Sequence, residues 1–215
     1  MSMLMRAPQP CGSWFWDLGE VEEPGLVSAL KIAARMVDVL REHDLLDPVM
    51  LEYRWYVLGA GSTGVTSGLL IPTTPLNDPK LSEKVLASRP IGFPDAEVGD
   101  LEVIGSGLWI TSEGASRKES RLIDLSVSPD PFGPSAEVAV HHDIWCWFDF
   151  SGRPHPEVYN QNAPRLAKAL EDLTSVLGVT PEAGEPTYFG HAHGCGISTP
   201  DSCDDGLGPD LTDKL

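Results

Sequence analysis

The sequence predicts an α+β domain with an antiparallel sheet of about five or six strands and two main helices packed on one face. Segments 26–42 and 163–177 carry apolar residues three or four positions apart, as a helix does when one side is buried. Between these segments, several stretches alternate apolar and polar residues, which is typical of strands. Short connections between successive strands favour antiparallel pairing, because parallel pairs need long crossovers.

Residues 1–24 are expected to form an irregular N-terminal arm that contains Trp14, Phe15 and Trp16. Exposing three large aromatic side chains is unfavourable, so we expect this arm to dock on the core. A partner-binding arm is the alternative. The helix over 26–42 follows, with acidic residues before its first turn and Pro48 beyond its end.

Segment 50–58 alternates as a strand, and the glycine-rich run GAGSTG follows it at 59–64. This run matches the spacing of a dinucleotide-binding fingerprint, and it loosely matches a nucleophile elbow centred on Ser62. Both motifs require a helix directly afterwards, whereas residues 65–71 are rich in β-branched and small residues and end before Pro72. The sequence therefore predicts a hairpin turn between two strands.

Asp78 and Pro79 predict the start of a short helix that ends before Pro90. Strands are expected at 102–112 and 121–128, joined by a polar turn at 113–118. Gly105 and Gly107 in the first of these strands indicate a bulge or a close backbone contact.

A further aromatic strand is expected at 136–150, followed by a polar loop and the helix over 163–177. Asn162 is the expected cap of this helix and Gly178 its stop signal. We expect residues 25–190 to form the single α+β domain. Residues 191–215 are expected to form an acidic, disordered tail, because 201–215 hold five aspartates and one lysine.

The chain is strongly acidic, with 32 Asp and Glu against 15 Lys and Arg and a net charge of −17. Such a charge repels phosphates, so nucleic acid and anionic membranes are not expected as partners. A basic protein is the expected partner, although an acidic surface also serves solubility alone.

The sequence predicts a cytoplasmic protein. No run approaches the ~20 apolar residues that a membrane-spanning helix needs. Pro8, Pro10 and Gly12 stand where a signal peptide would have its apolar run. The four cysteines are scattered, which favours free thiols in a reducing compartment.

His141, His142, Asp143 and His155 are the candidate catalytic residues. Adjacent strand residues point to opposite faces, so the two neighbouring histidines cannot act together on one ion. Either one beside Asp143 has the chemistry of a proton-transfer pair, but a structural pairing with the carboxylate is favoured. His155 is expected to be an exposed turn residue rather than a base.

The C-terminal segment contains the candidate metal ligands His191, His193, Cys195 and Cys203. Imidazole and thiolate donors at this spacing fit zinc. The favoured interpretation is a disordered tail with incidental donors, so no cofactor is expected.

Residues 143–190 contain the pattern D-x-x-G-x-P-x-P-E-V-x-x-x-N-A-P-R-L-A after an aromatic strand. This segment resembles a family of uncharacterised actinobacterial proteins, for which the resemblance implies no activity. The size, acidity and α+β pattern are similar to those of immunity proteins of bacterial toxin systems, by analogy only.

The hypothesis is therefore a protein-binding module, an immunity-type inhibitor that binds a basic toxin or effector through an acidic surface. One alternative is an enzyme with an unrecognised His/Asp site, with or without a metal. The other is a structural or assembly component. The sequence predicts no oligomeric state.

Overall fold

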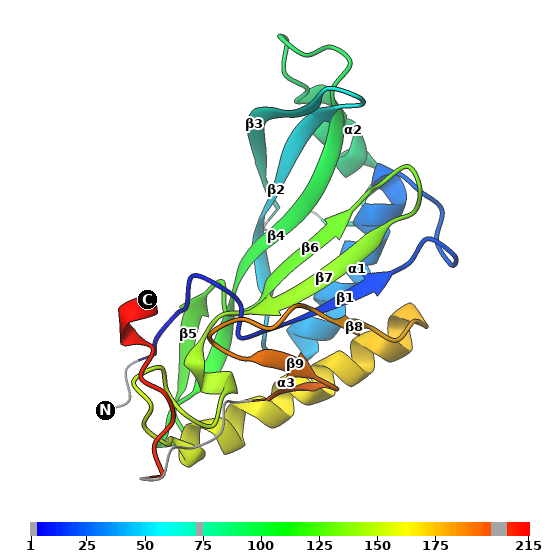
Figure 1. Ribbon diagram of the computed structural model, residues 1–215. Coiled ribbons are helices and arrows are strands. Elements are labelled where there is room, and N and C mark those ends of the chain that lie inside the picture. Colours follow the sequence, from blue (N-terminus) through cyan, green and yellow to red (C-terminus); the bar gives the residue numbers. More distant parts are fainter. Residues whose placement is uncertain (1–3, 72–74, 199–205) are drawn as a thin grey trace.

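The computed structural model describes residues 4–71, 75–198 and 206–215 (Figure 1). These residues form an α+β fold around an antiparallel sheet of eight strands, in the order β3-β2-β4-β6-β7-β1-β8 with β5 paired to β4. The predicted class and the antiparallel pairing are confirmed. The predicted number of strands is wrong, because three short strands come from segments expected to be arm, turn and loop.

The bounds of the elements are as follows. The strands are β1 (Gly12–Asp17), β2 (Asp47–Val57), β3 (Gly61–Leu70), β4 (Glu97–Ile110), β5 (Ser116–Ser120), β6 (Asp124–Ser128), β7 (Ser135–Val140), β8 (Glu182–Ala183), β9 (His191–His193) and β10 (Gly196–Ser198). The helices are α1 (Leu26–Glu42), α2 (Pro79–Ala87) and α3 (Pro156–Leu177), with 3-10 turns η1 (Asp143–Trp145) and η2 (Thr212–Lys214).

The three α-helices follow the sequence signals at most of their ends. Asp78 caps α2 by accepting a hydrogen bond from Lys80 N at 2.9 Å, and α3 ends at Gly178 with φ 72°. However, α3 begins at Pro156, so the predicted cap Asn162 lies inside the helix. Its side chain instead points to β4, where it hydrogen-bonds the backbone of Ile110. Among the described residues, no helix is long and apolar enough to cross a membrane.

The N-terminal segment is not an irregular arm. Residues 12–17 form β1, which pairs with β7 along its whole length and with β8 at its centre. Trp14 and Trp16 are buried, while Phe15 between them is 39% exposed, as the alternation of a strand requires. The aromatic run therefore belongs to the core of the sheet.

The expected strand over 136–150 ends at Val140. Asp143, Ile144 and Trp145 are all buried, and a strand cannot bury consecutive side chains on one face. A 3-10 turn can do so, and the Cys146 N–H closes it by donating to Asp143 O at 2.8 Å. The expected turn at 113–118 is also partly wrong, since residues 116–120 form β5 against β4.

The C-terminal residues 191–198 are not disordered but form the hairpin β9–β10. Trp14 Nε1 donates to Gly194 O at 2.7 Å and so ties this hairpin to β1. Residues 206–215 lie against the loop after η1, where Leu211 N donates to Phe150 O at 2.8 Å. The expectation of disorder is wrong for these segments, because backbone hydrogen bonds and buried aromatic contacts hold them in place.

Helix α1 packs against α3 and against β2, β4, β6 and β7. Figure 1 shows α1 behind the sheet and α3 running beneath it. The predicted hairpin is confirmed, since β2 pairs with β3 and Gly59 and Gly61 take positive φ values of 80° and 87° in the turn. The predicted close contact is also confirmed, because the backbone at Leu45 and Asp47 occupies the space that a side chain at Gly107 or Gly105 would fill.

Candidate functional site

The predicted catalytic residues do not form an open site. His141 is half-buried beside the sheet, with Nε2 at 3.3 Å from Asp124 Oδ2 and Nδ1 at 3.2 Å from Ala7 O. Burial, followed by the nearby Arg6, lowers the pKa of His141. This ring therefore has the structural carboxylate pairing that the sequence favoured, but with Asp124 rather than Asp143.

His142 and Asp143 are enclosed, each with 1% of its surface exposed. The N-terminal segment covers them, with Met5 N donating to Asp143 Oδ1 at 3.2 Å. His142 Nδ1 and Asp143 Oδ2 have no hydrogen-bond partner among the described residues. Burial lowers the pKa of His142 to about 4 and raises that of Asp143 to about 7, since it disfavours both charged forms.

His155 is buried, contrary to the prediction of an exposed turn residue. Its Nε2 lies 2.9 Å from Cys146 O, so the ring fastens the start of α3 to the segment after η1. The cavity beside Cys146 has a volume of ≈ 10 Å³, room for about one water molecule. Within the described part of the chain, the side chains of His142, Asp143 and His155 are therefore all buried.

Three of the four predicted metal ligands lie in the β9–β10 hairpin. His191 and His193 lie on β9 with their ring centroids 6.3 Å apart, and Cys195 is in the following turn. Within the described part of the chain, no group of three His, Cys, Asp or Glu side chains is placed to hold a metal ion. Cys203, the fourth predicted ligand, lies outside the described residues.

An open groove of ≈ 350 Å³ lies at the other end of the molecule, where α1 begins. Its walls come from the β1–α1 loop, the end of α2, the start of β4 and the β6–β7 loop, and Figure 1 shows these loops near α2 at one end. Leu18 N donates to Pro134 O at 3.0 Å, and this hydrogen bond joins the β1–α1 loop to the β6–β7 loop. We call this surface, formed by residues 17–27, 86–100 and 129–134, the loop face.

The loop face has an apolar centre. Pro24, Leu26, Leu86, Pro129 and Pro131 line the groove. Phe132, which directly follows Pro131 in the chain, is 93% exposed, and Leu86 is 45% exposed. Large apolar side chains gathered at one groove are unusual on a surface and are typical of interaction sites.

The rim of the loop face is acidic. Segments 17–27, 86–100 and 129–134 carry eight Asp and Glu residues, four, three and one respectively, and one basic residue, Arg89, which lines the groove. Glu97 accepts a hydrogen bond from Tyr56 Oη at 2.9 Å. Burial, then the Glu97 carboxylate, raises the pKa of Tyr56 to about 12, so this hydroxyl stays protonated.

Only faint signals for the loop face are present in the sequence. The PDPFGP run at 129–134 and the acidic run at 20–23 are visible in the sequence, but they lie far apart along it. Nothing local indicates that β1 and β7 bring them together.

No protein-family model, no curated protein and no solved structure matches the chain. The resemblance of residues 143–190 to an actinobacterial family stays a prediction.

Proposed function

We propose that the protein is a binding module that captures a basic protein through the loop face, as an immunity-type inhibitor of a toxin or effector. The observation that carries this proposal is an apolar groove on a surface whose three segments carry eight Asp and Glu residues and a single Arg. An apolar centre with a charged rim is the usual anatomy of a protein–protein interface.

The groove and its ring of prolines would take an apolar side chain of the partner. Affinity at interfaces comes largely from a few side chains that fill such pockets near the centre. Phe132 and Leu86 already lie in contact with water, so covering them recovers hydrophobic free energy at about 25 cal/mol per Å².

The acidic rim would select the sign of the partner's charge. Carboxylates attract Lys and Arg side chains around the apolar contact and accelerate association at low ionic strength. Effectors that act on nucleic acid need basic surfaces to hold phosphates, and an acidic inhibitor covers such a surface. The net charge of −17 extends this attraction over the whole molecule.

The enzyme hypothesis has less support. Its candidate residues His142, Asp143 and His155 are enclosed, and general acid–base catalysis needs groups that reach a substrate. The assembly hypothesis makes a separate prediction, a defined oligomer in native mass spectrometry.

The test is affinity capture from a lysate of the source organism with the wild-type chain and four variants. Phe132→Ser removes the exposed apolar side chain, and Glu23→Lys reverses a rim charge beside the groove. Leu70→Ser and Glu113→Lys make the same changes at exposed positions on β3 and before β5.

We expect the wild type and both control variants to capture the same basic protein. Phe132→Ser should weaken binding of the captured protein at least about tenfold. Glu23→Lys should slow the association of the two proteins, and it should do so more at low salt than at physiological salt. Absence of any captured protein at low and at physiological salt would overturn the proposal, as would equal losses in the control variants.

A further inference from the structure

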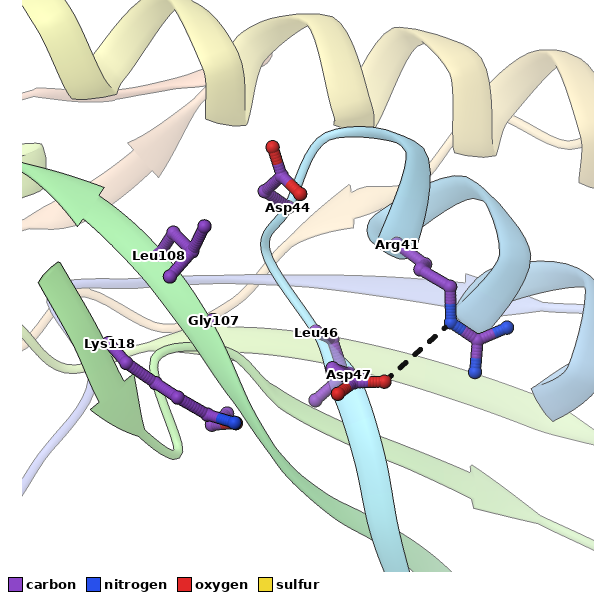
Figure 2. Close-up of a pocket in the computed structure, with 8 residues that line it drawn as sticks. Arg41, Asp44, Leu46, Asp47, Gly107, Leu108 and Lys118 are labelled. Carbon is purple, nitrogen blue, oxygen red and sulfur yellow. Dashed lines mark ion pairs between the residues drawn. The ribbon is translucent and has the colours of Figure 1, made fainter. Parts of the chain in front are cut away.

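A second pocket, of ≈ 280 Å³, lies at the opposite end of α1 from the loop face. It is bounded by the last turn of α1, the loop that leads into β2, and strands β4 and β5. Figure 2 shows Arg41, Asp44 and Asp47 on one side and Lys118 on the other, with Leu108 between them on β4. Ligand pockets commonly enclose about 300–1,000 Å³, so this one suits a small molecule.

The walls of this pocket are held firmly. Asp44 takes a left-handed conformation with φ 56°, and its carbonyl oxygen accepts from Leu108 N at 2.7 Å. Gly107 has no side chain at the point where the backbone of Leu45 crosses β4. Arg165 donates to His43 O at 2.7 Å and to Leu108 O at 2.9 Å, which joins the loop and the strand from behind. A rigid site of this kind loses little entropy on binding.

One buried polar group of the pocket lacks a partner. Ser106 is 9% exposed and lines the pocket, and its hydroxyl makes no hydrogen bond among the described residues. Buried hydroxyls are nearly always paired, so this one is a donor and acceptor left over for a water molecule or a ligand in the pocket.

The charges that line the pocket are balanced, and two of the four are without an ion pair among the described residues. Lys118 and Asp44 form no ion pair with any described residue, although both side chains line the pocket. Arg41 pairs with Asp47 at 3.8 Å and with Asp38, outside the pocket, at 3.6 Å. Figure 2 shows the Lys118 side chain extending toward Leu46 and Asp47. Two cations and two carboxylates at one cavity are complementary to a molecule that carries both charges.

We propose that this pocket binds a small zwitterion, an α-amino acid with an apolar side chain. Lys118 and the Ser106 hydroxyl hold the carboxylate, while Asp44 and Asp47 hold the ammonium group. Leu108 and the aliphatic part of the Lys118 stem contact the side chain. The inference does not depend on the loop face, because different residues form the two sites.

The experiment is calorimetric titration of the full chain with L-leucine, up to millimolar concentration. L-leucine methyl ester lacks the negative charge, and N-acetyl-L-leucine lacks the positive charge. We expect L-leucine to bind, and each blocked analogue to bind at least about tenfold more weakly, since each leaves two protein groups unpaired.

Matched variants locate the site. Lys118→Gln and Ser106→Ala should each weaken L-leucine binding several-fold, and Asp44→Asn should do so without disturbing the left-handed turn, which Asn tolerates. Arg117→Gln removes the same charge from the neighbouring residue of β5, which points to the opposite face, and should leave binding unchanged. No binding of L-leucine, equal binding of the methyl ester, or an equal loss in Arg117→Gln would overturn the proposal.

Discussion

His142 and Asp143 are neighbours in the chain whose pKa values are moved in opposite directions by the same cause. Burial stabilises the neutral imidazole, which lowers the pKa of His142 to about 4, and the neutral carboxylic acid, which raises the pKa of Asp143 to about 7. Arg6 and His141 add to the shift of His142, and Asp149 adds to that of Asp143. The two groups therefore oppose each other in the pH dependence of stability.

The sign of each residue's contribution to the pH dependence of stability follows from how many protons the folded and unfolded chains bind. Between about pH 4 and 6.5 the unfolded chain binds more protons at His142 than the folded chain, so this contribution to the free energy of unfolding rises with pH. Between about pH 4 and 7 the folded chain binds more protons at Asp143, so its contribution falls with pH. In the wild type the two slopes largely cancel where their windows overlap.

Asp143→Asn should remove the contribution of Asp143, so that the free energy of unfolding rises with pH as His142 alone dictates. We expect the free energy of unfolding of this variant, minus that of the wild type, to increase by about 2–3 kcal/mol between about pH 5 and 7.5. Denaturant unfolding at several pH values measures it. His142→Gln should give a difference of opposite sign, falling by about 2 kcal/mol over the same range. Differences of one sign for both variants, or flat differences, would count against the enclosure of these side chains.

For single residues, the sequence indicates which side chains can take part in proton transfer, but not which of them other segments of the chain bury. His141 and His142 lie in separate environments, as expected, although β7 ends at Val140 and only the isolated bridge between His142 and Arg6 continues the extended backbone. His155 was expected to be exposed because prolines flank it, yet its ring bonds Cys146 O. The residues that enclose Asp143 come from the N-terminus, more than a hundred positions away, and no local pattern contains that information.

At the scale of elements, Asn162 joins α3 to the end of β4. It is fully buried, and its Oδ1 accepts from Ile110 N at 2.9 Å. Its Nδ2 donates to Ile110 O at 2.8 Å and to Val158 O at 2.8 Å. The amide thus completes the backbone hydrogen bonding of Ile110, as a paired strand would.

Asn162→Ala should therefore destabilise the protein by about 2–4 kcal/mol, because it leaves the N–H and C=O of Ile110 without partners. Asn160→Ala changes an exposed residue of the same helix and should cost less than about 0.5 kcal/mol. Thermal and denaturant unfolding of the two variants measure the difference. Similar losses in both would show that helix propensity, rather than the link to β4, is the cause.

The elements that the sequence predicted correctly have local signals. The helices at 26–42 and 79–87 and the 50–70 hairpin show periodicity, caps or turn glycines within a few residues. Strands β5 and β8 show none, since they are short and polar or exposed, and they exist because a neighbouring strand offers hydrogen bonds. Helix α3 starts at Pro156 rather than at the predicted residue 163, and it contains Pro164, although proline is more usual in the first turn of a helix.

For the whole molecule, α1 connects the two proposed sites. Its 17 residues span about 25 Å, with the loop face at its first turn and the zwitterion pocket at its last. Variants in one site should therefore leave the other intact. Neither site could be predicted from the sequence, because each combines residues from segments that only the sheet order brings together.

The sheet order also makes the N-terminal strand a central part of the fold. β1 lies between β7 and β8, and Trp16 on it is fully buried. A buried Trp removes about 150–250 Å² from water, worth about 4–6 kcal/mol, while a whole domain is stable by only about 5–15 kcal/mol. One side chain of the supposed arm therefore accounts for a large part of the stability.

Trp16→Ala should consequently cost about 3–5 kcal/mol, measured by denaturant unfolding with circular dichroism. Phe15→Ala removes an aromatic side chain from the adjacent position of the same strand, but that side chain is partly exposed and should cost about 1 kcal/mol or less. Because β1 closes the sheet between β7 and β8, deleting residues 1–18 should prevent cooperative folding altogether. A truncated chain that still unfolds in one cooperative transition, with both proposed sites functional, would show that β1 is an accessory arm after all.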